Sequence, residues 1–162
     1  MTGKHRVRGL VADALLVLVA TMLGACSGPA PSMPAPPAVL ETTNEYAFSS
    51  ATRCIDGQTW GEVWDRAVGE FGRQGLRIES YVMSRHESWD ELKAYYAERL
   101  VSDRGWRADE TVVFGAEAFI WSDFAWSFAF RRDGYVIALV GLRSPHGEGG
   151  YIPVNVITNI PE

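Results

Sequence analysis

Residues 124–142 predict a β-hairpin, and this hairpin restricts the fold more than any other part of the sequence. In its first half the side chains alternate, with Phe124, Trp126, Phe128 and Phe130 on one face and smaller or polar residues on the other. The dipeptide Asp-Gly that follows at 133–134 is typical of a two-residue hairpin turn. The returning strand, 135–142, is apolar on both faces, which predicts a central position in its sheet.

Two amphipathic helices are expected before the hairpin, over residues 59–74 and 88–104. In both stretches apolar side chains recur at the spacing of one helix face. Thr59 and Ser88 each begin a capping box, with a glutamate three residues later, and a glycine follows each helix. The capping boxes are 29 residues apart and the two glycines 30 apart. This similarity leaves two interpretations open, a duplicated helix–strand unit or two independent helices with similar ends.

Further strands are expected within 46–55 and over 76–83, 106–114, 119–122 and 151–157. Pro153 predicts that the last of these is an edge strand, because proline has no amide hydrogen to donate. The order of elements predicts an α+β fold over residues 41–162. In this fold the two helices pack on one face of a mostly antiparallel sheet, forming a two-layer sandwich.

The N-terminus has the order of a secretory signal, with Lys4, Arg6 and Arg8 before the apolar run 14–23. The run is too short to cross a bilayer as a helix, which takes about 20 residues. It leads into Leu23-Gly24-Ala25-Cys26, which resembles the lipobox of bacterial lipoproteins. Two alternatives are a plain signal peptide with an accidental cysteine and an uncleaved anchor.

The lipobox resemblance implies that residues 1–25 are removed and that Cys26 receives a diacylglycerol, with a further acyl chain such as palmitate on the new amino terminus. It places the protein in the cell envelope, lipid-anchored on the extracytoplasmic side. Because Ser27 rather than Asp follows the cysteine, the family's sorting habits favour the outer membrane where the cell has one.

Residues 26–40 are expected to form a lipidated, proline-rich linker, since five prolines lie within 28–39. Such a segment favours polyproline II at about 3.1 Å per residue and would act as a semi-rigid stalk. Cleavage would lower the 15 basic and 20 acidic residues to 12 and 19, a net charge of −7. This charge argues against nucleic acid as a partner and against electrostatic binding to anionic lipid, so the lipid itself must hold the protein to the membrane.

No motif in the mature sequence predicts catalysis, a metal or a cofactor. His86-Glu87 lacks the second histidine of a zinc-binding helix, and no Gly-x-Ser-x-Gly is present. If Cys26 is acylated, Cys54 has no partner cysteine in the chain. Cys54 is then a buried small residue, a reactive thiol or half of an intermolecular bridge.

The segment from Ser88 through Tyr95-Tyr96 to Gly105-Trp106 is similar to small α+β domains of bacterial envelope lipoproteins. In those domains a helix with paired aromatic residues ends in Gly-Trp before strands. The resemblance covers about twenty residues and implies no functional residue.

The aromatic row from Phe124 to Phe130 is either core or an uncovered apolar patch. If it is uncovered, Trp121 and Trp126 are the expected anchors of an interaction surface. The glycine-rich loop 144–150 would add His146 and Glu148.

The sequence thus predicts a non-catalytic, membrane-anchored accessory protein whose domain binds an envelope protein partner. One alternative is a module that binds a small apolar or amphipathic ligand in a cavity near Trp64, Tyr96 and Trp126. The other is an envelope hydrolase, which needs His86 or His146 within reach of a nucleophile.

Overall fold

The computed structural model describes residues 29–42, 48–102, 105–109, 125–143 and 150–162. Within them are the helices α2 (Ser50–Phe71) and α3 (Trp89–Val101) and the strands β1 (Glu41–Thr42), β2 (Arg77–Ser84), β3 (Arg107–Ala108), β4 (Ala125–Arg132), β5 (Tyr135–Leu142) and β6 (Tyr151–Thr158). The strands form one sheet in the order β1-β2-β6-β5-β4-β3, and every neighbouring pair is antiparallel. The α+β class and the antiparallel sheet are therefore confirmed.

The predicted hairpin is present as β4 and β5, joined by Asp133 and Gly134. Both turn residues have positive φ, 44° for Asp133 and 86° for Gly134, as a type I′ turn requires. The position predicted for the returning strand is confirmed as well, because β5 lies between β4 and β6.

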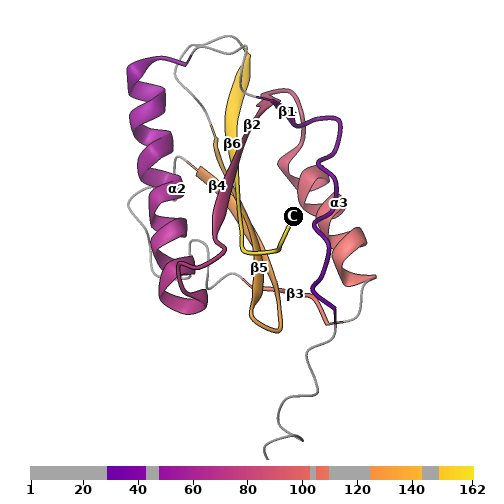
Figure 1. Ribbon diagram of the computed structural model, residues 1–162. Coiled ribbons are helices and arrows are strands. Elements are labelled where there is room, and N and C mark those ends of the chain that lie inside the picture. Colours follow the sequence, from indigo (N-terminus) through magenta and orange to yellow (C-terminus); the bar gives the residue numbers. More distant parts are fainter. Residues whose placement is uncertain (1–28, 43–47, 103–104, 110–124, 144–149) are drawn as a thin grey trace, which may run out of the picture. The chain divides into compact units, whose positions relative to one another are not determined.

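Side chains of β5 alternate between two separate cores. Val136, Ala138 and Val140 pack in the same cluster as α2 residues, whereas Ile137 and Leu139 pack in the cluster of α3. Figure 1 shows the two helices on opposite sides of the sheet. The prediction that both helices share one face is therefore wrong, and the sheet is the middle of three layers.

The composition of β4 explains how two different helices cover the sheet. Ala125 and Ala129 face α2 and leave room for its Trp60 and Trp64, which are partly buried there. On the α3 face, Phe128 and Phe130 are each 2% exposed. A strand that is apolar on both faces needs cover on both, because exposing either face would leave apolar area in water.

Of the aromatic row, Phe128 and Phe130 are thus core. The Trp126 ring stacks on Trp89 of α3 with ring centroids 5.7 Å apart, and the Trp89 and Phe128 centroids are 5.3 Å apart. Trp126 itself is half-buried. Phe124 lies outside the described residues.

Helix α2 begins nine residues before the predicted start. Ser49 is its N-cap, with a side-chain oxygen that accepts from the Thr52 amide at 3.1 Å. Thr59 is fully buried inside the helix and donates to the Asp56 carbonyl at 2.8 Å. The strand expected within 46–55 is wrong for residues 50–55, which are helical.

Helix α3 begins as predicted, with Ser88 as its N-cap. The two helices differ in length, 22 residues against 13, and only one of the two expected capping boxes caps a helix. The similarity between the two helical stretches therefore does not extend to how the helices begin.

Strand β6 is central, which corrects the edge position predicted from Pro153. Its ladder with β5 ends at Val154, opposite Gly141, so Pro153 lies one residue beyond that pairing. The missing amide hydrogen of the proline therefore falls outside the β5 ladder. Of the strand expected over 106–114, β3 is the described part, and residues 119–122 lie outside the described residues.

The proline-rich segment belongs to the folded unit, which spans Pro31–Glu162. Leu40 is 7% exposed in the α3-face core, and Met33 and Val39 pack against that core. Figure 1 shows this segment running beside α3 into β1. We call Pro31–Leu40 the strap. The expectation that it stands free as a stalk is wrong, and the domain extends ten residues further towards the N-terminus than predicted.

Gly141 provides a test of the α3 layer. A Cβ at this position would lie 3.0 Å from Cζ3 of Trp89 and 3.2 Å from the Pro153 carbonyl oxygen. Gly141→Ala is therefore expected to lower the free energy of unfolding by about 1–3 kcal/mol.

Gly57→Ala on α2 is the matched control, because its Cβ would meet nothing within 4 Å. The control should gain about 1 kcal/mol from helix propensity. Urea denaturation measures both, and an unchanged Gly141→Ala variant would contradict the packing.

Candidate functional site

A chain of hydrogen bonds on the α2 face joins α2, β6 and β2. Asn155 of β6 is 2% exposed. Its Nδ2 donates to the Asp56 carboxylate of α2 at 2.8 Å, and its Oδ1 accepts from Ser80 Oγ of β2 at 2.8 Å. Ser80 lies directly opposite Asn155 in the β2–β6 register. Both the nitrogen and the oxygen of this buried side-chain amide thus have partners.

Asp56 is the member of this chain with an unusual acidity. Burial raises the pKa of its carboxyl to about 6, against a smaller lowering by the hydrogen bond from Asn155. A raised carboxyl pKa is a common sign of a functional site. Here, however, Ser80 donates its proton to an amide oxygen, which is not a base. The arrangement does not activate a nucleophile, and what it does is hold α2 against the sheet.

A second polar cluster joins the far end of α2 to the sheet. Arg131 of β4 forms ion pairs with Glu70 in the last turn of α2 and with Asp109, whose carboxylate is 2.7 Å away. The Arg131 guanidinium also lies 5.1 Å from the centre of the Phe71 ring. These contacts fix the end of α2 over β4.

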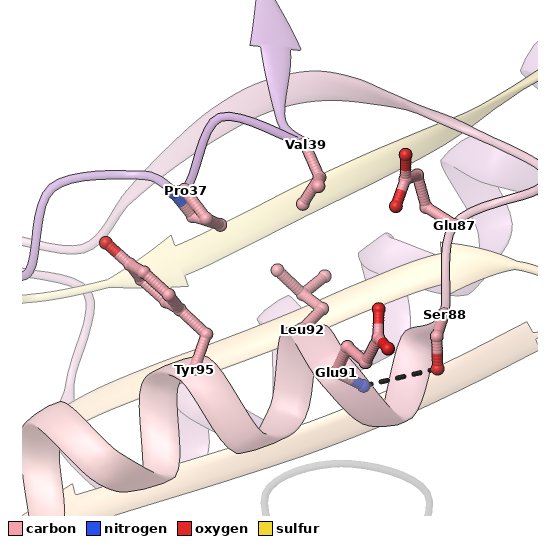
Figure 2. Close-up of a pocket in the computed structure, with 7 residues that line it drawn as sticks. All are labelled: Pro37, Val39, Glu87, Ser88, Glu91, Leu92 and Tyr95. Carbon is pink, nitrogen blue, oxygen red and sulfur yellow. Dashed lines mark hydrogen bonds between the residues drawn. The ribbon is translucent and has the colours of Figure 1, made fainter.

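A small pocket lies on the opposite face, between the strap and the start of α3 (Figure 2). Its volume is about 120 Å³, and it is lined by Pro37, Val39, Glu87, Ser88, Glu91, Leu92 and Tyr95. Pro37 and Tyr95 lie at one end and Glu87 and Ser88 at the other. Ligand sites for small molecules usually have about 300–1,000 Å³, so this pocket accommodates at most a side chain.

Tyr95 holds the strap at this place. Its hydroxyl donates to the carbonyl oxygen of Ala35 at 2.9 Å, and the guanidinium carbon of Arg99 lies 3.5 Å from the centre of the Tyr95 ring. The strap therefore lies against α3, and the pocket is an unfilled space between the two.

Trp126 is the one residue of the predicted interaction surface that the structure describes, and it lies half-buried beside Trp89. Trp121, His146 and Glu148 fall in residues 110–124 and 144–149, outside the described residues of the chain. The structure therefore does not test whether these four residues form one surface.

The prediction of a ligand cavity near Trp64, Tyr96 and Trp126 is wrong, because these residues lie on different faces of the sheet. Trp64 packs in the α2-face core, whereas Tyr96 and Trp126 belong to the α3 face. Because the sheet separates them, the three residues cannot line one cavity. Tyr96 is 1% exposed and packed in the core, with its ring centroid 6.2 Å from that of Phe128.

The remaining candidates for chemistry lie apart from one another. His86 is exposed in the turn before α3, and Cys54 is an exposed free thiol on α2, so the interpretation of Cys54 as a buried residue is wrong. Among the described residues, no group of three His, Cys, Asp or Glu side chains is placed to hold a metal ion. None of the described helices is long and apolar enough to cross a membrane.

Comparison of the chain with protein-family models, with curated proteins and with solved structures finds no match. Sequence reasoning missed the Ser80–Asn155–Asp56 chain, for which the one available signal was an asparagine inside the apolar strand 151–157.

The pKa of Asp56 predicts how the stability depends on pH. Burial penalises the ionised form, so the folded state loses stability as the pH rises from the ordinary carboxyl pKa of 3.8 through about 6. The whole rise of the pKa from 3.8 to about 6 corresponds to a loss of about 3 kcal/mol in the free energy of unfolding. Asp56→Asn keeps an oxygen that accepts from Asn155 and carries no charge. We expect this variant to be more stable than the wild type at pH 7.5 by up to that amount.

The difference between the two proteins should shrink towards zero as the pH is lowered to 4, as measured by urea denaturation across that range. Asp65→Asn, which neutralises an exposed carboxylate on the same helix, is the control and should change the free energy of unfolding by less than about 0.5 kcal/mol. A gap between wild type and Asp56→Asn that is the same at every pH would contradict the account.

Proposed function

We propose that the protein is a lipoprotein of the cell envelope, anchored on the extracytoplasmic side by acyl chains on Cys26. The sequence Leu23-Gly24-Ala25-Cys26, placed after a basic and an apolar segment, carries this proposal. The position of the folded unit supports it, because that unit begins at Pro31, five residues after the cysteine. The anchor therefore need not be accommodated within the domain.

The charge of the mature chain leaves the anchoring to the lipid. A net charge of −7 gives no polybasic surface for anionic headgroups. Each buried methylene group contributes about 0.8 kcal/mol, so two or three acyl chains hold a protein firmly where a single chain holds only marginally. In a cell with two membranes we propose the outer one, because Ser27 follows the cysteine.

We propose that the domain is a non-catalytic accessory module that binds an envelope protein. The proposal is supported by what the polar side chains of the domain do. Asn155 with Asp56, and Arg131 with Glu70, tie α2 to the sheet rather than surround a reactive group. The half-buried Trp126, two residues after the segment 110–124, is the described member of the proposed partner surface. Acidic composition argues against nucleic acid as the partner.

Acylation is tested by expressing the full chain in a bacterium that processes lipoproteins, with a labelled fatty acid in the medium. We expect the wild type to be labelled and to sediment with membranes, and Cys26→Ala to lose both properties entirely. Cys54→Ser is the control and should keep both, because it changes only the second cysteine of the chain. Equal labelling of Cys26→Ala, or a free thiol at position 26 in the purified wild type, would contradict the proposal.

The partner surface is tested with photo-crosslinking residues placed at positions 126, 146 and 148 in living cells. We expect an adduct of one defined mass from these positions. Gln58 and Glu98, which are exposed on α2 and α3, serve as controls and should give none. Adducts from the control positions alone would place the partner on the helices and contradict the proposed surface.

A further inference from the structure

The strap lies between the proposed anchor and the rest of the domain, so its docking sets the length of the tether. Cys26 and Pro31 are five residues apart, which gives a span of at most about 18 Å. If the strap leaves α3, the free segment extends from Cys26 to Glu41. Fifteen residues of polyproline II span about 46 Å.

The contacts of the strap are those of a segment that can detach without unfolding the sheet. Its prolines at 31, 34, 36 and 37 lack amide hydrogens, so it cannot pair with the sheet as a full strand. To the described remainder of the domain it makes one hydrogen bond, the bond from Tyr95 to the Ala35 carbonyl. The rest of its attachment is the burial of apolar side chains, chiefly Met33, Val39 and Leu40.

The direction of the strap determines how a pull on the anchor acts. Figure 2 shows Pro37 at the Tyr95 end of the pocket and Val39 further towards Glu87, just before α3, and Ala35 contacts Tyr95 itself. The strap therefore runs antiparallel to α3, and the end nearest the anchor, Pro31, is the first to be loaded. Its contacts would break successively from Pro31 towards β1, where Glu41 and Thr42 pair with β2.

We propose that the strap is a retractable section of the tether, docked on α3 to hold the domain close to the bilayer and released to let it stand further away. This inference rests on the proposed acylation of Cys26. In the docked state the domain is confined near the membrane, and in the released state it gains about 30 Å of reach from ten residues.

The test uses the acylated full-length protein in phosphatidylcholine vesicles that carry a headgroup acceptor dye. The donor dye is attached to Cys54, the exposed thiol, since Cys26 is blocked by acylation. Met33→Asp/Val39→Asp should release the strap, because both side chains pack against the core. Ser32→Asp/Ala38→Asp is the matched control, with the same two added charges at exposed positions of the strap.

We expect high energy transfer for the wild type and the control, and at least a twofold lower transfer for the releasing variant. If that variant does not fold, Tyr95→Ala removes the docking contact from the α3 side without changing the tether, and it should give the same loss. Equal transfer in wild type and folded releasing variants would overturn the inference. Protein that fails to sediment with the vesicles would overturn the proposed acylation instead, so the two failures are distinguishable.

Discussion

Burial of β5 on both faces is the constraint on which the rest of the structure depends. Val136, Ala138 and Val140 on one side and Ile137 and Leu139 on the other are all fully buried. A strand of this kind cannot belong to a two-layer structure, because one of its faces would then be open to water. The chain meets the requirement by sending its two helices to opposite faces, and the side-chain sizes on β4 match each helix to its face.

The strap adds to the cover that α3 gives its face of the sheet. The helix has 13 residues, whereas α2 has 22. Beside it, Leu40 of the strap lies in the core, and Met33 and Val39 pack against that core. A segment whose composition is typical of a linker is in this way recruited into the fold. The same recruitment shortens the proposed tether to the residues between Cys26 and Pro31. The packing of the strap therefore also sets how far the domain can lie from the membrane.

The elements that the sequence predicted correctly are those fixed by local chemistry. The Asp133-Gly134 turn depends on backbone conformations that few residues adopt, and Ser88 caps α3 through a hydrogen bond three residues along the chain. The start of α2 was missed because residues 50–58 contain few large apolar side chains and include Gly57, which is unfavourable within a helix. The positions of the strap and of β6 follow from contacts between distant segments, which periodicity along the chain does not encode.

The same distinction applies to the candidate site. Asp56 and Asn155 are 99 residues apart in the chain, and no spacing rule would have paired them. The Cys26 anchor, in contrast, depends on a contiguous stretch of sequence and could be proposed from the sequence alone. The residues that tie the layers together are thus not the ones that stand out in the sequence for their chemistry. His86 and Cys54 do stand out in the sequence, but they lie exposed and apart from the core.

The three-layer arrangement is tested most directly by nuclear Overhauser contacts of neighbouring residues in β5. The account predicts that the Ala138 methyl group contacts α2, at Val63 or Ala67, and that the Leu139 methyl groups contact α3, at Leu92 or Tyr96. Contacts from both residues to the same helix, or from Leu139 to neither, would contradict it.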